Sequence, residues 1–401
     1  MALANAVKDA LGSQSMIRKM FEEGTLLKKQ HGQDNVFDFS LGNPDVDPPE
    51  EFFTVLTKLT KEKKKGAHGY MPNGGFPDIR EILAKKVEEE QDVKIDGTHI
   101  IMSCGAAGGL NVVFKSILNP GDEVIVSKPY FMEYRPYTMN HGGSIVEVPA
   151  LEDFNLDVEG IKQKLSPKTA AVLINSPHNP TGKIYPGETL TALVKVLEEH
   201  GKACGRFPYL VSDEPYRQLA YDGIKVPPIL SLYSEAIVVY SYSKSLSLPG
   251  ERIGYITVGP DIKDKELLLG AFTYATRILG YVNAPALMQR VVGELCDVKI
   301  DLDIYDRRRK AFCKILDEAG IAYNKCEGAF YLFCKAPQSQ AAQGGNDLAF
   351  VELLKKHLIL GVPGSGFGMP GWFRLAYCVD EKVIQRSRDA FLKAMDEFKR
   401  V

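Results

Sequence analysis

Polar residues that could carry out chemistry follow short apolar segments in the middle of the chain. Lys244 comes directly after one such segment, and a lysine desolvated beside other cations loses its proton more readily and attacks carbonyls. Asp213 ends another segment, where a buried carboxylate needs a cationic partner. Each residue also has a simpler interpretation, Lys244 as a solvated surface amine and Asp213 as a helix N-cap.

Two arginines and a small-residue segment could bind anions. Arg252 carries a planar, permanently charged fork that suits a phosphate. Arg374 lies inside an apolar segment, which is costly unless a ligand carboxylate or a structural Asp or Glu pairs with it. The segment 105–108, Gly-Ala-Ala-Gly, could cradle a phosphate at a helix N-terminus or form a tight turn. It matches neither the Walker pattern nor the dinucleotide fingerprint.

Asn179 completes the set, because the prolines around it would hold its amide near the strand ends, although a polar turn is the alternative. Along the chain the candidates are a phosphate cradle, Asn, Asp, Tyr, Lys and two Arg. Together they describe a site for a phosphorylated aldehyde that forms a Schiff base with lysine, its ring nitrogen paired to a carboxylate.

Seven apolar segments of strand length must position these residues, and helical patterns such as 110–118 and 187–200 lie between them. Continuous apolar runs suit strands buried on both faces, so the pattern predicts an α/β sandwich around a mostly parallel sheet. Ligands bind at the carboxyl ends of such strands. The predicted strands are 98–102, 123–127, 144–148, 169–175, 209–213, 236–241 and 252–259.

The C-terminal third has a different pattern that predicts a smaller α+β domain. A helical segment over 285–319 opens it, and a strand at 328–333 follows. A helix over 348–357, a strand at 373–377 and a last helix over 381–399 complete it.

The composition narrows the class of protein. The 401 residues include 49 Lys and Arg and 51 Asp and Glu, a net charge of −2, which argues against nucleic acid and anionic membranes as partners. No apolar run approaches the ~18 residues of a membrane span, and we expect no signal peptide. The seven scattered cysteines contain no Cys-x-x-Cys pair. We therefore expect no disulfide framework and no metal site, and a cytoplasmic location.

Three motifs carry a resemblance to a known family. They are NSPHNPTG (175–182), SDEPY (212–216) and SYSKSLSLPGERIG (241–254). LGNPD, HGYMPNGG, GAFYLF and FRLAY match in the same order. With them the chain resembles the class I/II aminotransferases of the fold type I pyridoxal-phosphate enzymes, from about residue 16 to its end.

The resemblance implies a fold and an activity. The expected fold is a three-layer α/β/α large domain (48–285) with a mostly parallel seven-stranded sheet. A smaller α+β domain would be built from both chain ends (1–47 and 286–401). The expected cofactor is pyridoxal 5′-phosphate. The expected reaction moves an amino group between an L-amino acid and a 2-oxo acid by a ping-pong mechanism, through a Schiff base on Lys244.

The resemblance also implies catalytic and cofactor-binding roles. Lys244 would hold the cofactor aldehyde and move the substrate proton, and Asp213 would pair with the ring nitrogen. Asn179 and Tyr216 would donate to the phenolic oxygen of the ring, and Phe131 would stack on its face. The implied phosphate-binding residues are Ala106, Ala107, Ser241, Ser243 and Arg252.

Further implied roles concern the substrate and a second subunit. Arg374 would bind the substrate α-carboxylate, with Gly42 and Asn179 as additional contacts. Tyr70 would reach the phosphate of the neighbouring subunit, so we expect a homodimer. Tyr134 and Phe367 are candidates for the substrate pocket.

Two departures from the family pattern and three alternatives stay open at this point. Ala107 stands where aspartate-specific bacterial relatives carry Lys, which weakens a dicarboxylate preference, and Pro215 replaces an aliphatic residue. A β-C–S lyase would share the cofactor residues. A sensor domain fused to a DNA-binding segment would need more chain before residue 16. A dinucleotide-binding oxidoreductase would need the fingerprint that is missing here.

Overall fold

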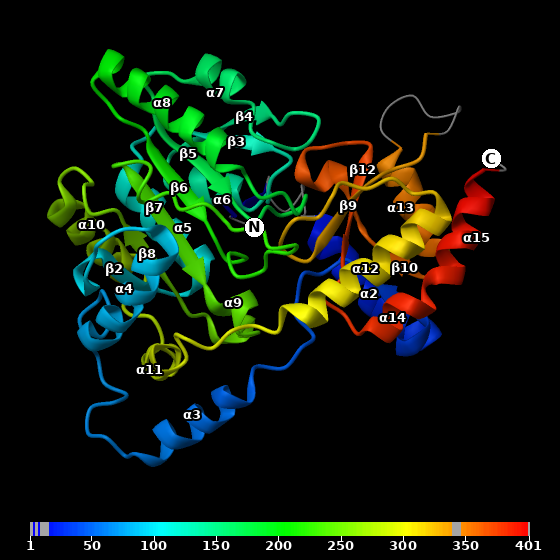
Figure 1. The fold of residues 1–401 in the computed structure, drawn as a ribbon, viewed down its shortest axis with the longest axis horizontal. Coiled ribbons are helices and arrows are strands. Elements are labelled where there is room, and N and C mark those ends of the chain that lie inside the picture. Colours follow the sequence, from blue (N-terminus) through cyan, green and yellow to red (C-terminus); the bar gives the residue numbers. More distant parts are fainter. Residues whose placement is uncertain (1–2, 5–6, 9–15, 339–345, 400–401) are drawn as a thin grey trace.

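The centre of the molecule is a seven-stranded sheet in the order β2-β8-β7-β6-β5-β3-β4 (Figure 1). The computed structural model describes residues 3–4, 7–8, 16–338 and 346–399. All neighbouring strands are parallel except β8, which is antiparallel to β2 and β7. The predicted mostly parallel sheet is therefore confirmed. The strands are β2 (Ile100–Ser103), β3 (Glu123–Lys128), β4 (Ser144–Pro149), β5 (Thr169–Asn175), β6 (Tyr209–Asp213), β7 (Ala236–Ser241) and β8 (Gly254–Val258).

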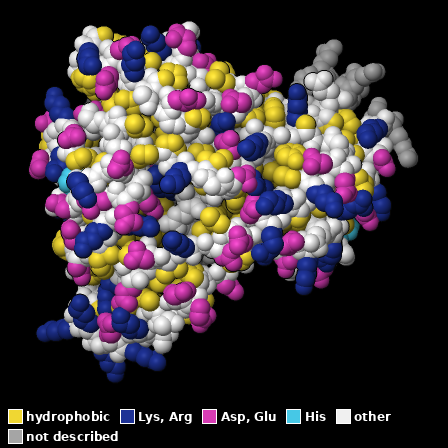
Figure 2. Space-filling view, viewed as in Figure 1, with side chains coloured by type: hydrophobic (Ala, Val, Ile, Leu, Met, Phe, Trp, Pro, Cys, Tyr) yellow, Lys and Arg dark blue, Asp and Glu magenta, His cyan; other side chains and the backbone are white. Residues whose placement is uncertain are grey.

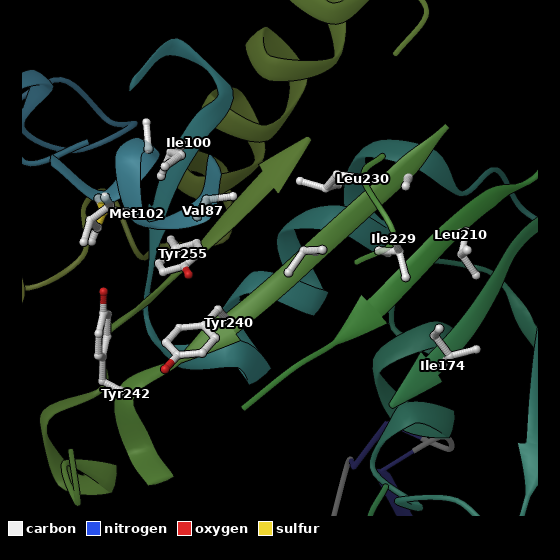
Figure 3. Packing of buried hydrophobic residues seen from close by; sticks show 14 of the residues in the cluster. Val87, Ile100, Met102, Ile174, Leu210, Ile229, Leu230, Tyr240, Tyr242 and Tyr255 are labelled. Carbon is white, nitrogen blue, oxygen red and sulfur yellow. The ribbon is translucent and has the colours of Figure 1, made fainter. Parts of the chain in front are cut away.

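Helices cover both faces of this sheet, because alternate residues of its strands point to opposite sides. On β5, Val172 and Ile174 belong to one buried cluster, while Ala171 and Leu173 belong to another. Figure 3 shows the first cluster, where Val87 lies near the sheet. Its helices are α3 (Glu50–Lys61), α4 (Pro77–Gln91), α7 (Val158–Lys164), α8 (Gly187–Cys204) and α11 (Ala286–Glu294). The other face carries α5 (Gly105–Ile117), α6 (Tyr134–Met139) and α10 (Lys265–Ile278).

A smaller α+β part combines both ends of the chain. Its sheet is antiparallel, in the order β11-β12-β9. A short parallel pair joins β1 to β10, and Met20 and Phe39 share a buried cluster with C-terminal residues. Helix α2 lies among the C-terminal helices (Figure 1). The elements are α2 (Met16–His31), β1 (Phe37–Asp38), α12 (Leu302–Ala319), β9 (Tyr331–Lys335), α13 (Asp347–Lys356), β10 (Ile359–Leu360), β11 (Val362–Pro363), β12 (Trp372–Ala376), α14 (Glu381–Arg386) and α15 (Arg388–Phe398).

Three local predictions for this part are wrong. The helix expected over 285–319 is two helices, because the Asp301 side chain accepts a hydrogen bond from the Asp303 backbone and starts α12. The last helix is also split, at Ser387, whose hydroxyl donates to the Ile384 carbonyl. The strand expected from residue 328 begins three residues later, after Ala329, which has a left-handed φ of 59°.

The face of the molecule drawn in Figure 2 has no large area of a single charge sign among the described residues. Positive and negative side chains are interspersed on the face seen in Figure 2, consistent with the net charge of −2. Within the described ranges, no helix has the length and apolar character to span a membrane.

Candidate active site

A cavity of about 480 Å³ lies where β5, β6 and β7 end. Asn175, Asp213 and Ser241, the last residues of these strands, all line it. Tyr70 does not line it, being 94% exposed and lining a separate cavity with Tyr281. The other predicted site residues come together here: Gly42, Ala106, Ala107, Phe131, Asn179, Asp213, Tyr216, Ser241, Ser243, Lys244, Arg252 and Arg374.

Lys244 lies on α9 (Tyr242–Ser245), a single turn that directly follows β7. The Ser241 side chain accepts a hydrogen bond from the Ser243 backbone and begins this turn. The ammonium of Lys244 donates to the Gly42 carbonyl at 2.7 Å. Burial lowers the pKa of Lys244, Cys378 partly opposes this, and Arg374 and Arg252 add to the lowering, so that the pKa is about 8. Lys244 is therefore a half-buried amine with a lowered pKa, and not a solvated surface amine.

Asp213 is a buried carboxylate with one unused oxygen. Its Oδ2 accepts a hydrogen bond from the Tyr134 hydroxyl at 2.6 Å. Its Oδ1 is buried and has no hydrogen-bond partner among the described residues. Burial raises the pKa of Asp213 to about 7. A cationic N–H group in the cavity would satisfy Oδ1 and lower this pKa.

The neighbouring carboxylate belongs to a different environment. Glu214 accepts hydrogen bonds from Arg217 at 2.9 Å and from Gln91 at 3.0 Å, and it does not line the cavity. This matches the expectation that successive residues at the strand end point to opposite sides. Only one carboxylate of the pair is therefore available to a ligand in the cavity.

Arg374, on β12, is buried, and none of the carboxylates that the structure describes pairs with it. Its Nη1 donates to Asn179 Oδ1 at 2.9 Å and its Nη2 to the Ser40 carbonyl at 2.7 Å. Its guanidinium carbon lies 4.4 Å from the Tyr331 ring centroid and 4.9 Å from that of Phe367. Its Nε has no partner among the described residues. Of the two partners considered from the sequence, this leaves the ligand carboxylate.

Tyr216 and Gly42 are both positioned by Tyr331. The hydroxyls of Tyr216 and Tyr331 lie 2.8 Å apart. Burial raises the pKa of Tyr216 well above its ordinary value, so its hydroxyl stays protonated and able to donate. A Cβ at Gly42 would overlap the Tyr331 hydroxyl, which explains why glycine occupies a position so close to Lys244.

Backbone N–H groups, hydroxyls and a guanidinium converge at the start of α5. This helix begins at Gly105, earlier than the predicted 110, so Ala106 and Ala107 lie in its first turn. The Ser241 and Ser243 hydroxyl oxygens lie 2.7 Å apart. With Arg252, all of these line the same cavity. Free N–H groups at a helix N-terminus beside an arginine form an anion site.

Some site residues were missed from the sequence. Tyr331 lies in a strand-like aromatic run, where the periodicity indicates only core packing, so no local signal pointed to its contact with Arg374. Tyr134 lines the cavity, whereas Phe367 packs beneath Arg374 without lining it. Glu133 and Tyr137 also line the cavity. Glu133 directly precedes α6 and Tyr137 lies on it; because their residue types and spacing resemble those of any partly exposed helix, neither was identifiable.

Comparisons with a family model, with curated relatives and with solved structures all match this chain to aminotransferases. The family model for aminotransferase class I and II matches residues 34–391. A probable aspartate/prephenate aminotransferase of Aquifex aeolicus is 32% identical over 372 residues, covering 90% of this chain and 92% of the relative. The crystal structure of an aminotransferase from Eubacterium rectale matches with a TM-score of 0.94 and 37% identity, covering 99% of this chain and 100% of that one. Aspartate aminotransferase from Thermus thermophilus with maleate matches with a TM-score of 0.87 and 28% identity, covering 98% and 100%.

Proposed function

We propose, from the premise that the chain belongs to the class I and II aminotransferase family, that the cavity at Lys244 binds pyridoxal 5′-phosphate. The chain is an aminotransferase, and the names of its relatives do not favour the alternative β-C–S lyase. The observation that carries the cofactor proposal is the buried Oδ1 of Asp213, which has no partner within the part of the chain that the structure describes. It lies in the same cavity as a lysine with a pKa of about 8.

The cavity fits this cofactor group by group. Asp213 would bind the ring nitrogen, Phe131 would pack on the ring, and Asn179 and Tyr216 would donate to its phenolic oxygen. When bound, the cofactor supplies a ring that withdraws the electron pair of the substrate Cα–H bond. The phosphate would be held by Ala106, Ala107, Ser241, Ser243 and Arg252.

The chain's own residues would then bind the cofactor aldehyde, move the Cα proton of the substrate and keep the ring nitrogen protonated. The neutral Nζ of Lys244 would bind the cofactor aldehyde and, once released, remove the proton from the substrate Cα. A pKa of about 8 leaves a useful fraction of this amine neutral near pH 7. The Asp213 carboxylate would hold the ring nitrogen in its protonated form.

Arg374 would bind the α-carboxylate that the amino acid and the 2-oxo acid share. Its Nε has no partner in the described ranges of the chain and would be able to donate. The Tyr331 and Phe367 rings hold the guanidinium plane in place. Asn179 and Gly42 would add polar contacts. One carboxylate site would thus serve both halves of a ping-pong reaction.

We propose that the cofactor-binding domain extends beyond the expected range of 48–285 to the end of α11, because α11 packs in the same buried cluster as α3 and α4. The smaller domain would then combine 1–47 with the chain after α11, in a cytoplasmic homodimer. Tyr70 is 94% exposed and does not line the Lys244 cavity of its own chain. It would therefore be available to the phosphate in a second copy of the chain. The relative from Aquifex aeolicus is named for aspartate and prephenate, and we take amino acids and 2-oxo acids as the substrate classes here.

The visible absorption spectrum of the purified protein tests this function. With pyridoxal phosphate bound, we expect a visible band that L-amino acid donors abolish and 2-oxo acids restore. In Lys244→Ala the band and the turnover should both be lost, while the circular dichroism spectrum stays unchanged. Lys94→Ala, which removes a lysine whose side chain is 95% exposed, is the control. Transamination by Lys244→Ala at near-normal rate would contradict the proposal.

A further inference from the structure

The proposed function leaves one charged residue of the cavity unexplained. Four of the charged lining residues bind the cofactor or the α-carboxylate in the preceding account. The fifth, Glu133, has no role in it. The charged lining residues are Glu133, Asp213, Lys244, Arg252 and Arg374.

The Glu133 carboxylate has no structural partner that would explain it. Glu133 precedes α6, but its side chain makes no capping hydrogen bond. Arg135, the nearest arginine in sequence, donates instead to Glu147 at 2.6 Å, and Lys128 pairs with the same glutamate at 3.1 Å. Within the described residues, no ion pair or hydrogen bond involves the Glu133 side chain. Its half-buried position leaves the carboxylate available to a ligand.

Tyr137 shows that this carboxylate acts on the cavity. It lies one turn after Glu133 and also lines the cavity. Burial raises the pKa of Tyr137, Glu133 and Asp213 also raise it, and Arg252 lowers it, so that the pKa is about 12. The three charged groups are therefore all within electrostatic reach of one phenol, so Glu133 contributes a negative field where a substrate enters.

We infer that Glu133 selects the substrate side chain, so that amino acids with a cationic side chain are the preferred donors, neutral ones follow and dicarboxylic ones come last. This inference rests on the proposed function, because it assigns Arg374 to the α-carboxylate and Arg252 to the phosphate. A second substrate carboxylate would then find no cation among the described lining residues and would face Glu133. A cationic side chain would instead pair with Glu133 beside the rings of Phe131 and Tyr137.

The inference predicts a donor preference that differs from the aspartate for which several relatives are named. The Thermus thermophilus structure carries maleate, a dicarboxylate. In a partly desolvated cavity, a like charge within about 6–8 Å weakens binding by at least about ten-fold. We therefore expect aspartate and glutamate to be poor donors for this enzyme.

The test compares donors of similar length on the holoenzyme. The rate at which the visible band disappears would be measured with L-lysine, L-norleucine and L-glutamate. The wild type should give a kcat/KM for lysine at least about ten-fold above that for glutamate, with norleucine between them. In Glu133→Gln the lysine-to-glutamate ratio should fall by about ten-fold. Glu159→Gln, in the exposed first turn of α7 and outside the cavity, should leave this ratio unchanged.

Two contrary outcomes are distinguishable. If the wild type prefers glutamate and Glu133→Gln keeps that order, a cation outside the described cavity neutralises Glu133, and this inference is wrong while the proposed function stands. If no amino acid abolishes the band, the proposed function is wrong and the inference fails with it. An unchanged cofactor band in Glu133→Gln confirms that the variant binds the cofactor normally.

Discussion

At the residue scale, burial shifts the pKa values of two site residues, one basic and one acidic, toward neutral pH. Lys244 has its pKa lowered to about 8 and Asp213 has its pKa raised to about 7, in both cases mainly because burial disfavours the charged form. Before any ligand binds, each group can thus be partly uncharged at pH 7. A cofactor with a cationic ring nitrogen would stabilise the ionised form of Asp213 and remove the cost of its unpaired oxygen.

The raised pKa of Asp213 predicts how the stability of the cofactor-free protein depends on pH. Below about pH 4 the Asp213 carboxyl is protonated in both the folded and the unfolded state, so it does not reduce the free energy of unfolding. Between about pH 4 and 7 the folded state holds the proton more tightly, so the free energy of unfolding falls as the pH rises. Each pKa unit corresponds to about 1.4 kcal/mol, so the loss should reach a few kcal/mol.

Urea denaturation of the cofactor-free wild type and of Asp213→Asn, from pH 4 to pH 8, measures this effect. The wild type should lose stability relative to Asp213→Asn as the pH rises to about 7. Asp34→Asn, at an exposed position, is the control and should follow the wild type. A constant difference between wild type and Asp213→Asn across this range would show that Asp213 ionises at its ordinary pKa.

At the element scale, the site depends on how α5 begins. Gly105 is the first residue of this helix and has a left-handed φ of 68°. A Cβ built there would lie 2.8 Å from Nη2 of Arg252. Because only glycine adopts this conformation without strain, Gly105 permits the first turn of α5 and Arg252 to approach the same anion.

Gly105→Ala should therefore weaken pyridoxal phosphate binding by about ten-fold, or about 1.4 kcal/mol, because the new methyl group displaces Arg252. Titration of the cofactor-free protein, followed by absorbance, gives the dissociation constant. Gly250→Ala, in the neighbouring η3 (Pro249–Glu251) and with open space around a new Cβ, is the control. Equal affinities for the two variants would exclude this role for Gly105.

At the scale of the whole molecule, the cavity is built from segments far apart in the chain. Lys244 contacts Gly42, and Arg374 contacts Asn179. Arg309 of α12 also pairs with Asp222 at 2.8 Å. The strand ends of the central sheet therefore supply the residues that we propose to bind the cofactor, and the smaller part supplies Arg374, which we propose to bind the carboxylate.

The exposed Tyr70 extends this argument to a second copy of the chain. If Tyr70 completes the partner's site, mixing Tyr70→Ala with Lys244→Ala should form hybrid dimers that each contain one intact site. Random reassortment would restore roughly a quarter of the wild-type activity, measured after the mixed chains are unfolded and refolded together. Each variant refolded alone is the control. No gain above the Tyr70→Ala protein alone would argue that Tyr70 acts within its own chain or not at all.

The sequence alone determined the sheet and most of the cavity lining. Apolar runs predict buried strands, and the residue after each run must emerge at the strand end, so Asp213 and Lys244 were identifiable from local patterns. The motifs around Asn179 and Arg252 then indicated the cofactor through family resemblance. The structure confirms that most of these residues line one cavity, but the role of each site residue and the domain boundaries stay predictions.

Only the tertiary structure decided which partners these residues have. Tyr134 donates a hydrogen bond to Asp213 on another element. Arg374 packs between Tyr331 and Phe367. Glu133 lines the cavity. Local periodicity shows whether a side chain is buried, but it carries no information about which distant side chain it meets. The break of the predicted helix over 285–319 has a local origin instead, because the Asp301 side chain caps α12 through the backbone of Asp303.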